Sequence, residues 1–440
     1  MRFLTERIER LITYVYLLVF ANVFWPPDAY FVNPSGANQG ASDIFDSMAF
    51  ALLAVFLGIA LLARWQQTLR LLRFGWPVMA LIGLAFLSSF WAEAPSLVIR
   101  RSGTVTLTSL FGVYLVSRYE LGELIAMLVK IYALAMLASL AMIVAFPSIG
   151  IGHNENYIHA WRGAFTDKNT LGLAAAITMI VSVYGFHRRF GPRWLSVAAL
   201  AMSVVAFKLA NSKTPLVDLV AALYCGVLAV MLHRRTGFGL IAAFVVAVLG
   251  LVAIGLFAFD PAGILEALGR NPTFTDRARI WHYVIDYIAR RPWFGYGYGG
   301  FWRSGGVEAN QIWAMVKFKT PHAHNAWLEV GLGLGIAGMG LVAVNWLAAF
   351  YRVARLMTAP AARHVAFCLA LLAAIFMENL TEYEFFRPGD MMWVLFVVAS
   401  VHLAQIRIAV REGRREPSVP SAAPLRAPTT AAQGPARGVV

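Results

Sequence analysis

Two histidines, His322 and His324, stand one residue apart in the stretch TPHAHNAWLEVGLGLGIAG, which leads into an apolar, glycine-rich run. Histidine is costly in hydrocarbon and common in active sites, because its charge changes near neutral pH. Three roles are open to the pair: metal ligand, structural cap of a helix, or general base. Zinc would need further ligands, and no cysteine or second histidine cluster at ligand spacing is expected on the same face. For His322 we favour the cap. A general base would profit from a helix N-terminus and nearby arginines, which keep an imidazole neutral.

The elements that position this pair are predicted to be membrane helices. Of the 440 residues, 59% are hydrophobic and only 14% are charged, whereas soluble domains carry about 25% charged residues. Apolar runs of about 20 residues, enough to cross the hydrocarbon core, recur along the chain. The sequence therefore predicts an all-α polytopic membrane protein with about twelve transmembrane helices, at 8–25, 44–63, 75–92, 97–117, 121–146, 169–186, 194–211, 214–232, 238–259, 324–350, 363–382 and 388–406. No cleavable signal is expected, because the basic N-terminal segment runs straight into a full-length span.

The distribution of Lys and Arg in the short loops predicts the orientation. With twelve spans, the basic loops all fall on one side, which should be the cytoplasm and hold both termini. Residues 1–406 then form the transmembrane domain, 260–323 form a long periplasmic loop, and 407–440 form a disordered cytoplasmic tail rich in Pro, Ala, Ser and Arg. Much of the net charge of +14 follows from this topology, so it is no argument for nucleic-acid binding.

Basic residues on the other side need a different explanation. They are Arg162, Lys168, Lys208, Lys213 and a group in the long loop: Arg270, Arg277, Arg279, Arg290, Arg291, Arg303, Lys317 and Lys319. An anionic ligand on the periplasmic face is the simplest one.

The long loop is expected to contain an amphipathic helix. It would start near Thr275, with Arg290 and Arg291 in its last turn, and end before Pro292. Arg277 and Arg279 lie at its start, where a cation opposes the helix dipole and therefore suggests a counter-anion. An ordinary solvated face is the alternative. The GYGYGG segment that follows, 295–300, would let the backbone approach a ligand closely, although it lacks the context of a dinucleotide-binding loop.

Four stretches carry a family resemblance. They are RGAFTDKNTLG (162–172), NSKTPLVDL (211–219), DRARIW (276–281), and His324-Asn325 followed by Gly335 and Gly338. In this order and on one face, they resemble the bacterial O-antigen ligases, within the wider group of O-antigen ligases and polymerases.

The resemblance implies a GT-C-like fold and glycosyl transfer on the periplasmic face of the bacterial inner membrane. Glycan would pass from undecaprenyl diphosphate to a sugar hydroxyl of lipid A–core, by an inverting, metal-independent reaction. By motif position, His324 would be the general base and Arg162, Arg279 and Lys213 would bind the diphosphate. Supporting roles would fall to Asn325, His322, Asn169 and Arg277, and a helix cap is an equal alternative for Asn325.

The residues themselves fit that chemistry. A lipid diphosphate leaving group needs its charge neutralised, by Mg²⁺ or by fixed cations. The outer loops offer scattered carboxylates and no Asp-x-Asp motif, which favours arginine and no metal or other cofactor. Glu378, Glu382 and Glu384 end the eleventh span, where they would either bind the acceptor or pair with Arg387.

Two other functions remain possible. A polymerase or a protein O-oligosaccharyltransferase would use the same lipid-linked donor. A transporter or flippase for an anionic lipid is more distant, because it would be expected to show an internal repeat, and none is evident.

Overall fold

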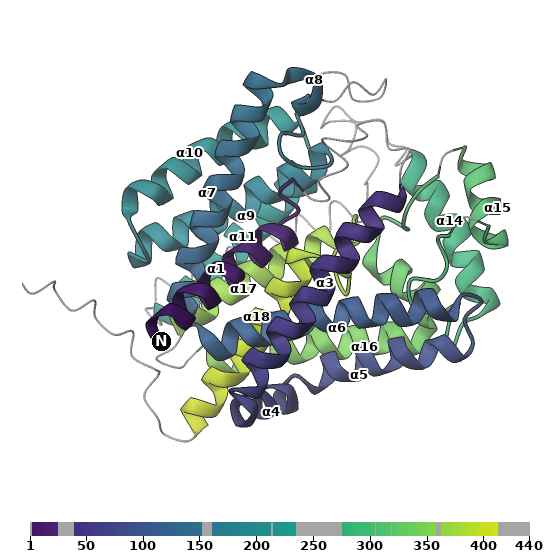
Figure 1. Ribbon diagram of the computed structural model, residues 1–440, viewed down its shortest axis with the longest axis horizontal. Helices are drawn as coiled ribbons and strands as arrows, with labels where there is room; N and C mark the ends of the chain where they lie inside the picture. Colours follow the sequence, from purple (N-terminus) through teal and green to yellow (C-terminus); the bar gives the residue numbers. More distant parts are fainter. Residues whose placement is uncertain are drawn as a thin grey trace, which may run out of the picture.

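The computed structural model describes residues 2–24, 39–151, 161–212, 214–234, 275–303, 305–317, 319–357 and 362–411. These residues form helices joined by short connections and contain no strand beyond one isolated bridge between Ile151 and Trp161. The helices, shown in Figure 1, are α1 (Arg2–Phe20), α3 (Gln39–Leu62), α4 (Trp65–Phe74), α5 (Trp76–Leu87), η1 (Ser88–Phe90), α6 (Pro95–Arg118), α7 (Leu121–Ala145), α8 (Pro147–Gly150), α9 (Lys168–Arg188), α10 (Arg193–Ala210), α11 (Thr214–Arg234), α14 (Thr275–Arg290), α15 (Val307–Val316), α16 (Ala326–Leu356), α17 (Ala362–Glu378) and α18 (Met391–Arg411).

The all-α polytopic architecture is confirmed. Six of the described helices are long and apolar enough to cross a membrane, or seven if the bent pair α4 and α5 counts as one span. Eleven of the twelve expected spans coincide with helices, and the twelfth, 238–259, lies outside the described residues. The count of twelve stays a prediction, because α11 and α17 are shorter apolar helices and α1 and α6 are less apolar. Helix α18 runs on to Arg411, past the expected limit at 406, and 412–440 lie outside the described part.

At one end of the bundle, the carboxylate of Glu9 on α1 connects α1 to neighbouring helices. It accepts hydrogen bonds from Arg118 Nε at 3.0 Å and from the Tyr114 hydroxyl at 3.3 Å, and it pairs with Arg64 at 3.0 Å. The Thr13 hydroxyl lies 2.9 Å from that of Tyr114. These contacts bring the start of α1 to the ends of α3 and α6, so we call this group the Glu9 cluster.

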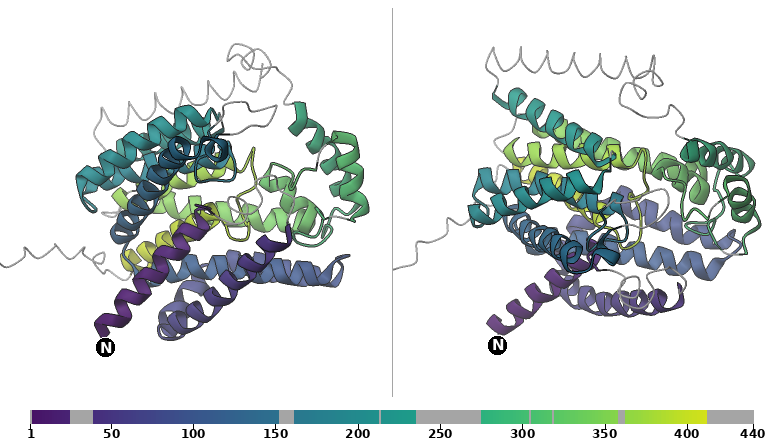
Figure 2. Two further views of the ribbon diagram at one scale, coloured as in Figure 1. Left: turned by 45° about the horizontal axis from the view of Figure 1, so that its top comes forward. Right: turned by 90° about the horizontal axis from the view of Figure 1, so that it is seen from above.

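The opposite end carries a small domain-like cap with its own core. Helices α14 and α15 stand at this end, away from the N-terminus (Figure 2). Ile280, Val284, Ile312 and Leu332 are buried together with rings such as Phe301. The cap therefore has an apolar centre separate from the main core, which is built largely around α18 and its neighbours.

The expected loop helix is confirmed as α14, with Pro292 two residues after its end. A second helix, α15, was not expected. Its segment VEANQIWAMV starts after Gly306 and ends at Lys317, whose φ of 65° stops the helix. Short helices of this kind lack a strong periodic signal, because only three of the ten residues are buried.

The GYGYGG segment packs its backbone against α16. The amide of Tyr296 donates to Leu332 O at 2.8 Å, and that of Gly297 donates to Gly333 O at 2.9 Å. Gly335 takes a left-handed φ of 62° inside α16, and a Cβ atom there would lie 2.4 Å from the carbonyl carbon of Trp293. The close approach that the glycines were expected to offer a ligand is made instead to a helix, and it fixes the first turns of α16 against the cap.

Candidate active site

The site forms where the loop before α16 meets the loop after α17. Asn325 is the N-cap of α16, because its Oδ1 accepts from the Leu328 amide at 3.0 Å, and its Nδ2 donates to Leu380 O at 2.9 Å. This is the cap role that had been left open for Asn325. His322 is not the cap. His324, the residue before Asn325, has a left-handed φ of 51°. Its ring points toward the loop after α17.

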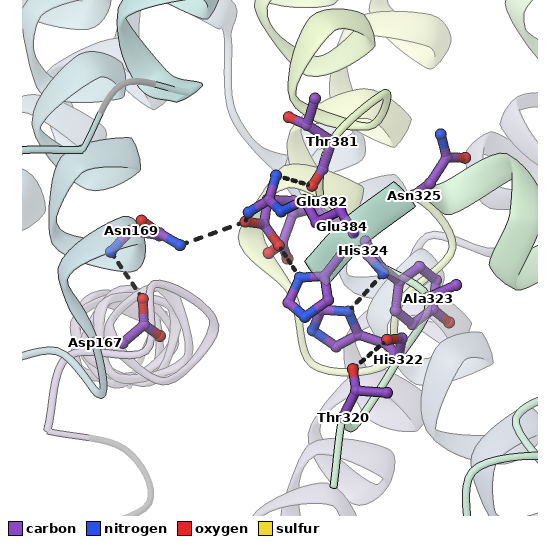
Figure 3. Close-up of polar contacts among 12 residues, drawn as sticks. Asp167, Asn169, Thr320, His322, Ala323, His324, Asn325, Thr381, Glu382 and Glu384 are labelled. Atoms are coloured by element: carbon purple, nitrogen blue, oxygen red, sulfur yellow. Dashed lines mark hydrogen bonds and ion pairs between the residues drawn. The ribbon is translucent and has the colours of Figure 1, made fainter. Parts of the chain in front are cut away.

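His324 is paired with a carboxylate. Its Nδ1 lies 2.9 Å from Oε2 of Glu382, and the Glu382 side chain is only 9% exposed (Figure 3). A carboxylate at Nδ1 favours the tautomer with its proton there, so that Nε2 carries the lone pair. Among the described residues, no group hydrogen-bonds to Nε2. The ring therefore presents an oriented, accepting nitrogen, which is the arrangement a general base needs.

Glu382 is itself held by two further groups through its other oxygen. Arg277, at the start of α14, donates to Oε1 and also to Thr381 O at 2.6 Å. Asn169 Nδ2, at the start of α9, lies 3.4 Å from the same oxygen (Figure 3). The counter-anion expected for Arg277 is thus the protein's own carboxylate. Burial alone would raise the pKa of Glu382, but His324 and Arg277 outweigh burial and hold that pKa below its ordinary value.

His322 lies beside His324 and faces Tyr383. Its Nδ1 accepts a hydrogen bond from the His324 amide at 3.2 Å, and the two ring centroids are 4.3 Å apart. Burial lowers the pKa of His322 well below its usual range, and the charges of Arg387 and Arg277 act in the same direction. The ring therefore stays neutral and supports the backbone of its neighbour.

A second buried carboxylate, that of Glu329, holds the backbone of the segment from His322 to His324, which we call the histidine loop. Oε2 of Glu329, in the first turns of α16, accepts from the Ala323 amide at 2.8 Å and from Trp302 Nε1 at 2.9 Å. Glu384 pairs with Arg387 at 3.0 Å, which is one of the two roles considered for that group of glutamates. Glu382, by contrast, turns toward His324, an arrangement that the sequence analysis did not anticipate.

Of the other predicted residues, Asn169 joins this network, and Arg162 and Arg279 donate to backbone carbonyls. Asn169 also accepts from Ser212 Oγ at 2.8 Å, and Asp167 caps α9 by accepting from the Asn169 and Thr170 amides. Arg162, in the loop before α9, donates to Ile149 O and Thr166 O. Arg279 donates to Met315 O at 2.8 Å, at the end of α15, so its guanidinium turns away from Glu382. Lys213 lies outside the described residues.

One group of side chains also has the composition of a metal site. One ligand atom from each of His322, His324 and Glu382 lies within 4.8 Å of the others. Two imidazoles and a carboxylate suit a transition metal rather than Mg²⁺ or Ca²⁺.

Comparison with known proteins identifies the region. Residues 198–343, which include α14, α15 and the histidine loop, match the family model described as O-antigen ligase. This part of the chain is similar to the O-antigen ligases. The chain is also 25% identical over 331 residues to the exopolysaccharide production protein ExoQ of Rhizobium meliloti (strain 1021), covering 71% of this chain and 73% of that protein. These matches support a glycosyltransferase-like membrane enzyme that works on lipid-linked polysaccharide.

Within the O-antigen ligase region the structure gathers His324, Asn325, His322 and Arg277. The two groups that complete the network, Asn169 and Glu382, lie outside the matched residues, before and after them. The site is therefore built from α9, α14, α16 and the loop after α17, and no single stretch of the chain contains it.

Proposed function

We propose that this protein transfers a glycan from a polyprenyl diphosphate carrier to a sugar hydroxyl, on the periplasmic face of the bacterial inner membrane. The observation that carries the proposal is the 2.9 Å contact between His324 Nδ1 and Glu382 Oε2, with Glu382 held by Arg277. Similarity to the O-antigen ligases supports the reaction class.

In the proposed reaction, His324 Nε2 takes the proton of the acceptor hydroxyl as its oxygen attacks the anomeric carbon. The bond from that carbon to the diphosphate breaks on the opposite side, so the configuration inverts. Glu382 accepts the Nδ1–H hydrogen bond and stabilises the imidazolium that forms. The diphosphate leaves as an anion, with Arg162, Arg279 and Lys213 as its proposed partners, since a guanidinium binds phosphate oxygens through two parallel hydrogen bonds.

The chemistry proposed for this site uses no metal. Fixed cations neutralise the leaving group, and the base is an imidazole. Transfer should therefore continue in EDTA. Loss of activity on chelation, restored by Mg²⁺ or Mn²⁺, would contradict the arginine account.

Two acceptors are candidates. The family description favours lipid A–core, which makes the enzyme an O-antigen ligase in lipopolysaccharide assembly. The similarity to a protein named for exopolysaccharide production favours a second lipid-linked glycan, which makes it a polymerase. Both reactions use the same donor and the same base, so the site network serves either.

Reconstitution in liposomes tests the proposal and separates the acceptors. Purified protein receives an undecaprenyl-diphosphate-linked glycan together with lipid A–core, with a second lipid-linked glycan, or with neither. A glycan joined to lipid A–core identifies a ligase, and a lengthened lipid-linked chain identifies a polymerase. A wild-type protein that only releases free glycan from the donor and forms neither joined product, or whose rate is matched by His324→Ala, would overturn the proposal.

Orientation has its own test. Val307 on α15 is 64% exposed and Leu69 on α4 is 55% exposed, at the site end and near the Glu9 cluster respectively. In a background lacking Cys225 and Cys368, Val307→Cys should react with an impermeant thiol reagent in intact spheroplasts, and Leu69→Cys only after lysis. The reverse pattern would place the site on the cytoplasmic face.

A further inference from the structure

We propose that His322, His324 and Glu382 bind a transition-metal ion of the Zn²⁺ class, and that the bound ion switches the site off. The binding itself follows from the side-chain geometry. The inhibitory effect rests on the proposed function of His324 as a base.

The geometry of the three side chains is close to that of a filled site. Their ligand atoms lie within 4.8 Å of one another, and His324 Nδ1 is 2.9 Å from Glu382 Oε2. In a tetrahedral zinc site with bonds of about 2.0 Å, neighbouring ligand atoms are about 3.3 Å apart. An ion bridging this pair would need only a small opening of the contact, and one ring nitrogen of His322 would supply the third ligand.

The surroundings of the three side chains also suit an ion. Arg277 and Asn169 approach Oε1 of Glu382, so Oε2 can turn from His324 to a metal while the carboxylate keeps its support. Carboxylate ligands of metals are usually held in this way by outer groups. Among the described residues, no fourth His, Cys, Asp or Glu joins the group, so water would complete the coordination.

The same surroundings limit the affinity. Arg277 contacts the carboxylate directly, and the charges of both Arg277 and Arg387 act on His322. Two permanent cations close to a divalent ion oppose its binding, so the site is suited to reversible occupation rather than to a permanent structural metal.

Metal binding at Nδ1 of His324 removes the base by shifting one proton. A neutral imidazole carries a single ring proton, which rests on Nδ1 when Glu382 accepts it. An ion that takes the Nδ1 lone pair requires that proton to lie on Nε2. Nε2 then has no lone pair to accept the proton of the acceptor hydroxyl, and Glu382 no longer assists it.

Calorimetric titration of the EDTA-treated, detergent-solubilised full chain with Zn²⁺ tests the site directly. The wild type should bind one ion per chain. His322→Asn and Glu382→Gln should each weaken binding at least tenfold, and His282→Asn, which removes an exposed histidine of α14, should not. Absence of saturable binding, or binding that survives both ligand variants, would overturn the proposal.

Transfer assays then test the inhibitory role, with each protein compared with its own metal-free rate. Zn²⁺ should slow wild-type transfer, and His322→Asn should need at least tenfold more Zn²⁺ for the same fractional loss. Transfer that is unaffected at saturating zinc would overturn the switch. Transfer that requires zinc after EDTA would overturn both the switch and the metal-free base. If zinc binds as described but no preparation transfers glycan, the proposed function fails and the binding site stands.

Discussion

Each end of the bundle holds a carboxylate between basic groups, and the two differ in what surrounds them. Glu9 lies among Arg64, Arg118 and the Tyr114 hydroxyl, which hold it by ion pairs and a hydrogen bond. Glu382 lies between Arg277 and His324, and a histidine ring can give and take a proton. The first arrangement ties three helices together. The second keeps the same kind of ion pair but adds a group that can react.

The difference also appears in what each carboxylate connects. The partners of Glu9 are Arg64, which lies between α3 and α4, and Tyr114 and Arg118 near the end of α6, all in the main bundle. The partners of Glu382 come from α9, α14 and the loop before α16, and two of these belong to the cap or its border. A substrate that bridges cap and bundle would meet Glu382 and His324, whereas the Glu9 cluster joins helix to helix only.

The largest contrast is expected from matched amide variants. Glu382→Gln should lower the turnover of folded protein by about 10²- to 10⁴-fold, because the base loses its oriented tautomer. Glu9→Gln should leave turnover within a few-fold and lower the free energy of unfolding by about 1–2 kcal/mol, since two partly exposed guanidiniums lose their counter-charge. Single-turnover rates and thermal unfolding of both variants measure the contrast. Equal rate losses would mean that both carboxylates are structural.

The two arginines that we propose to bind the donor diphosphate should give an intermediate effect. Charge-assisted hydrogen bonds contribute about 1.5–3 kcal/mol, so Arg162→Ala and Arg279→Ala should each weaken donor affinity by about 10- to 100-fold and also slow turnover. Lysine at either position should recover only part of this, because it lacks the planar fork. Arg355→Ala, an exposed position near the other end of α16, is the matched control. Donor affinity unchanged in both site variants would assign the diphosphate to other cations.

A smaller effect is expected from pH. His324 and Arg277 hold the folded pKa of Glu382 below its ordinary value of 4.5. Its contribution to stability is therefore present above about pH 4.5 and is lost as pH falls through the folded pKa. The difference in unfolding midpoint between wild type and Glu382→Gln should be constant from pH 7 to 5 and shrink in more acidic solution. A difference that grew on acidification would reverse the assigned sign.

The smallest effect is expected at the helix cap. Asn325→Ala should lower the free energy of unfolding by about 1 kcal/mol, as usual for loss of an N-cap, while Asn325→Asp keeps the accepting oxygen and should lose less. Turnover should fall less than tenfold, because His324 keeps Glu382. A rate loss as large as that of Glu382→Gln would give Asn325 a direct part in the reaction.

The sequence predicted the helices well and the site only in part. Long apolar runs and the Thr275 to Pro292 segment determine helices locally, so their positions could be predicted without tertiary structure. His324, Asn325 and Arg277 stood out by motif and charge. Their shared partner could not be identified, because Glu382 lies 58 positions beyond His324 and is one of three glutamates within seven residues. Only the turn after α17 decides which of them faces the histidine.

The partners of Arg277 and Arg279 could not be predicted from the sequence either. Two positions apart on a helix, their side chains cannot face the same way. The sequence justified an interest in both, but the placement of α14 between Glu382 and α15 decides that Arg277 reaches the carboxylate and Arg279 reaches Met315 O. The glycines at 295–300 likewise predicted that the backbone would approach another group closely, but the sequence did not show that this group is the backbone of α16.

The most direct test of the central claim is a double-mutant cycle between His324 and Glu382, measured as single-turnover transfer. If Glu382 acts by orienting the base, it has nothing to orient once the ring is gone. The account predicts that His324→Ala loses about 10²- to 10⁴-fold, and that adding Glu382→Gln to it costs no further rate. Losses that multiply in the double variant would show that the two residues act independently, and would contradict the pairing on which the proposed mechanism depends.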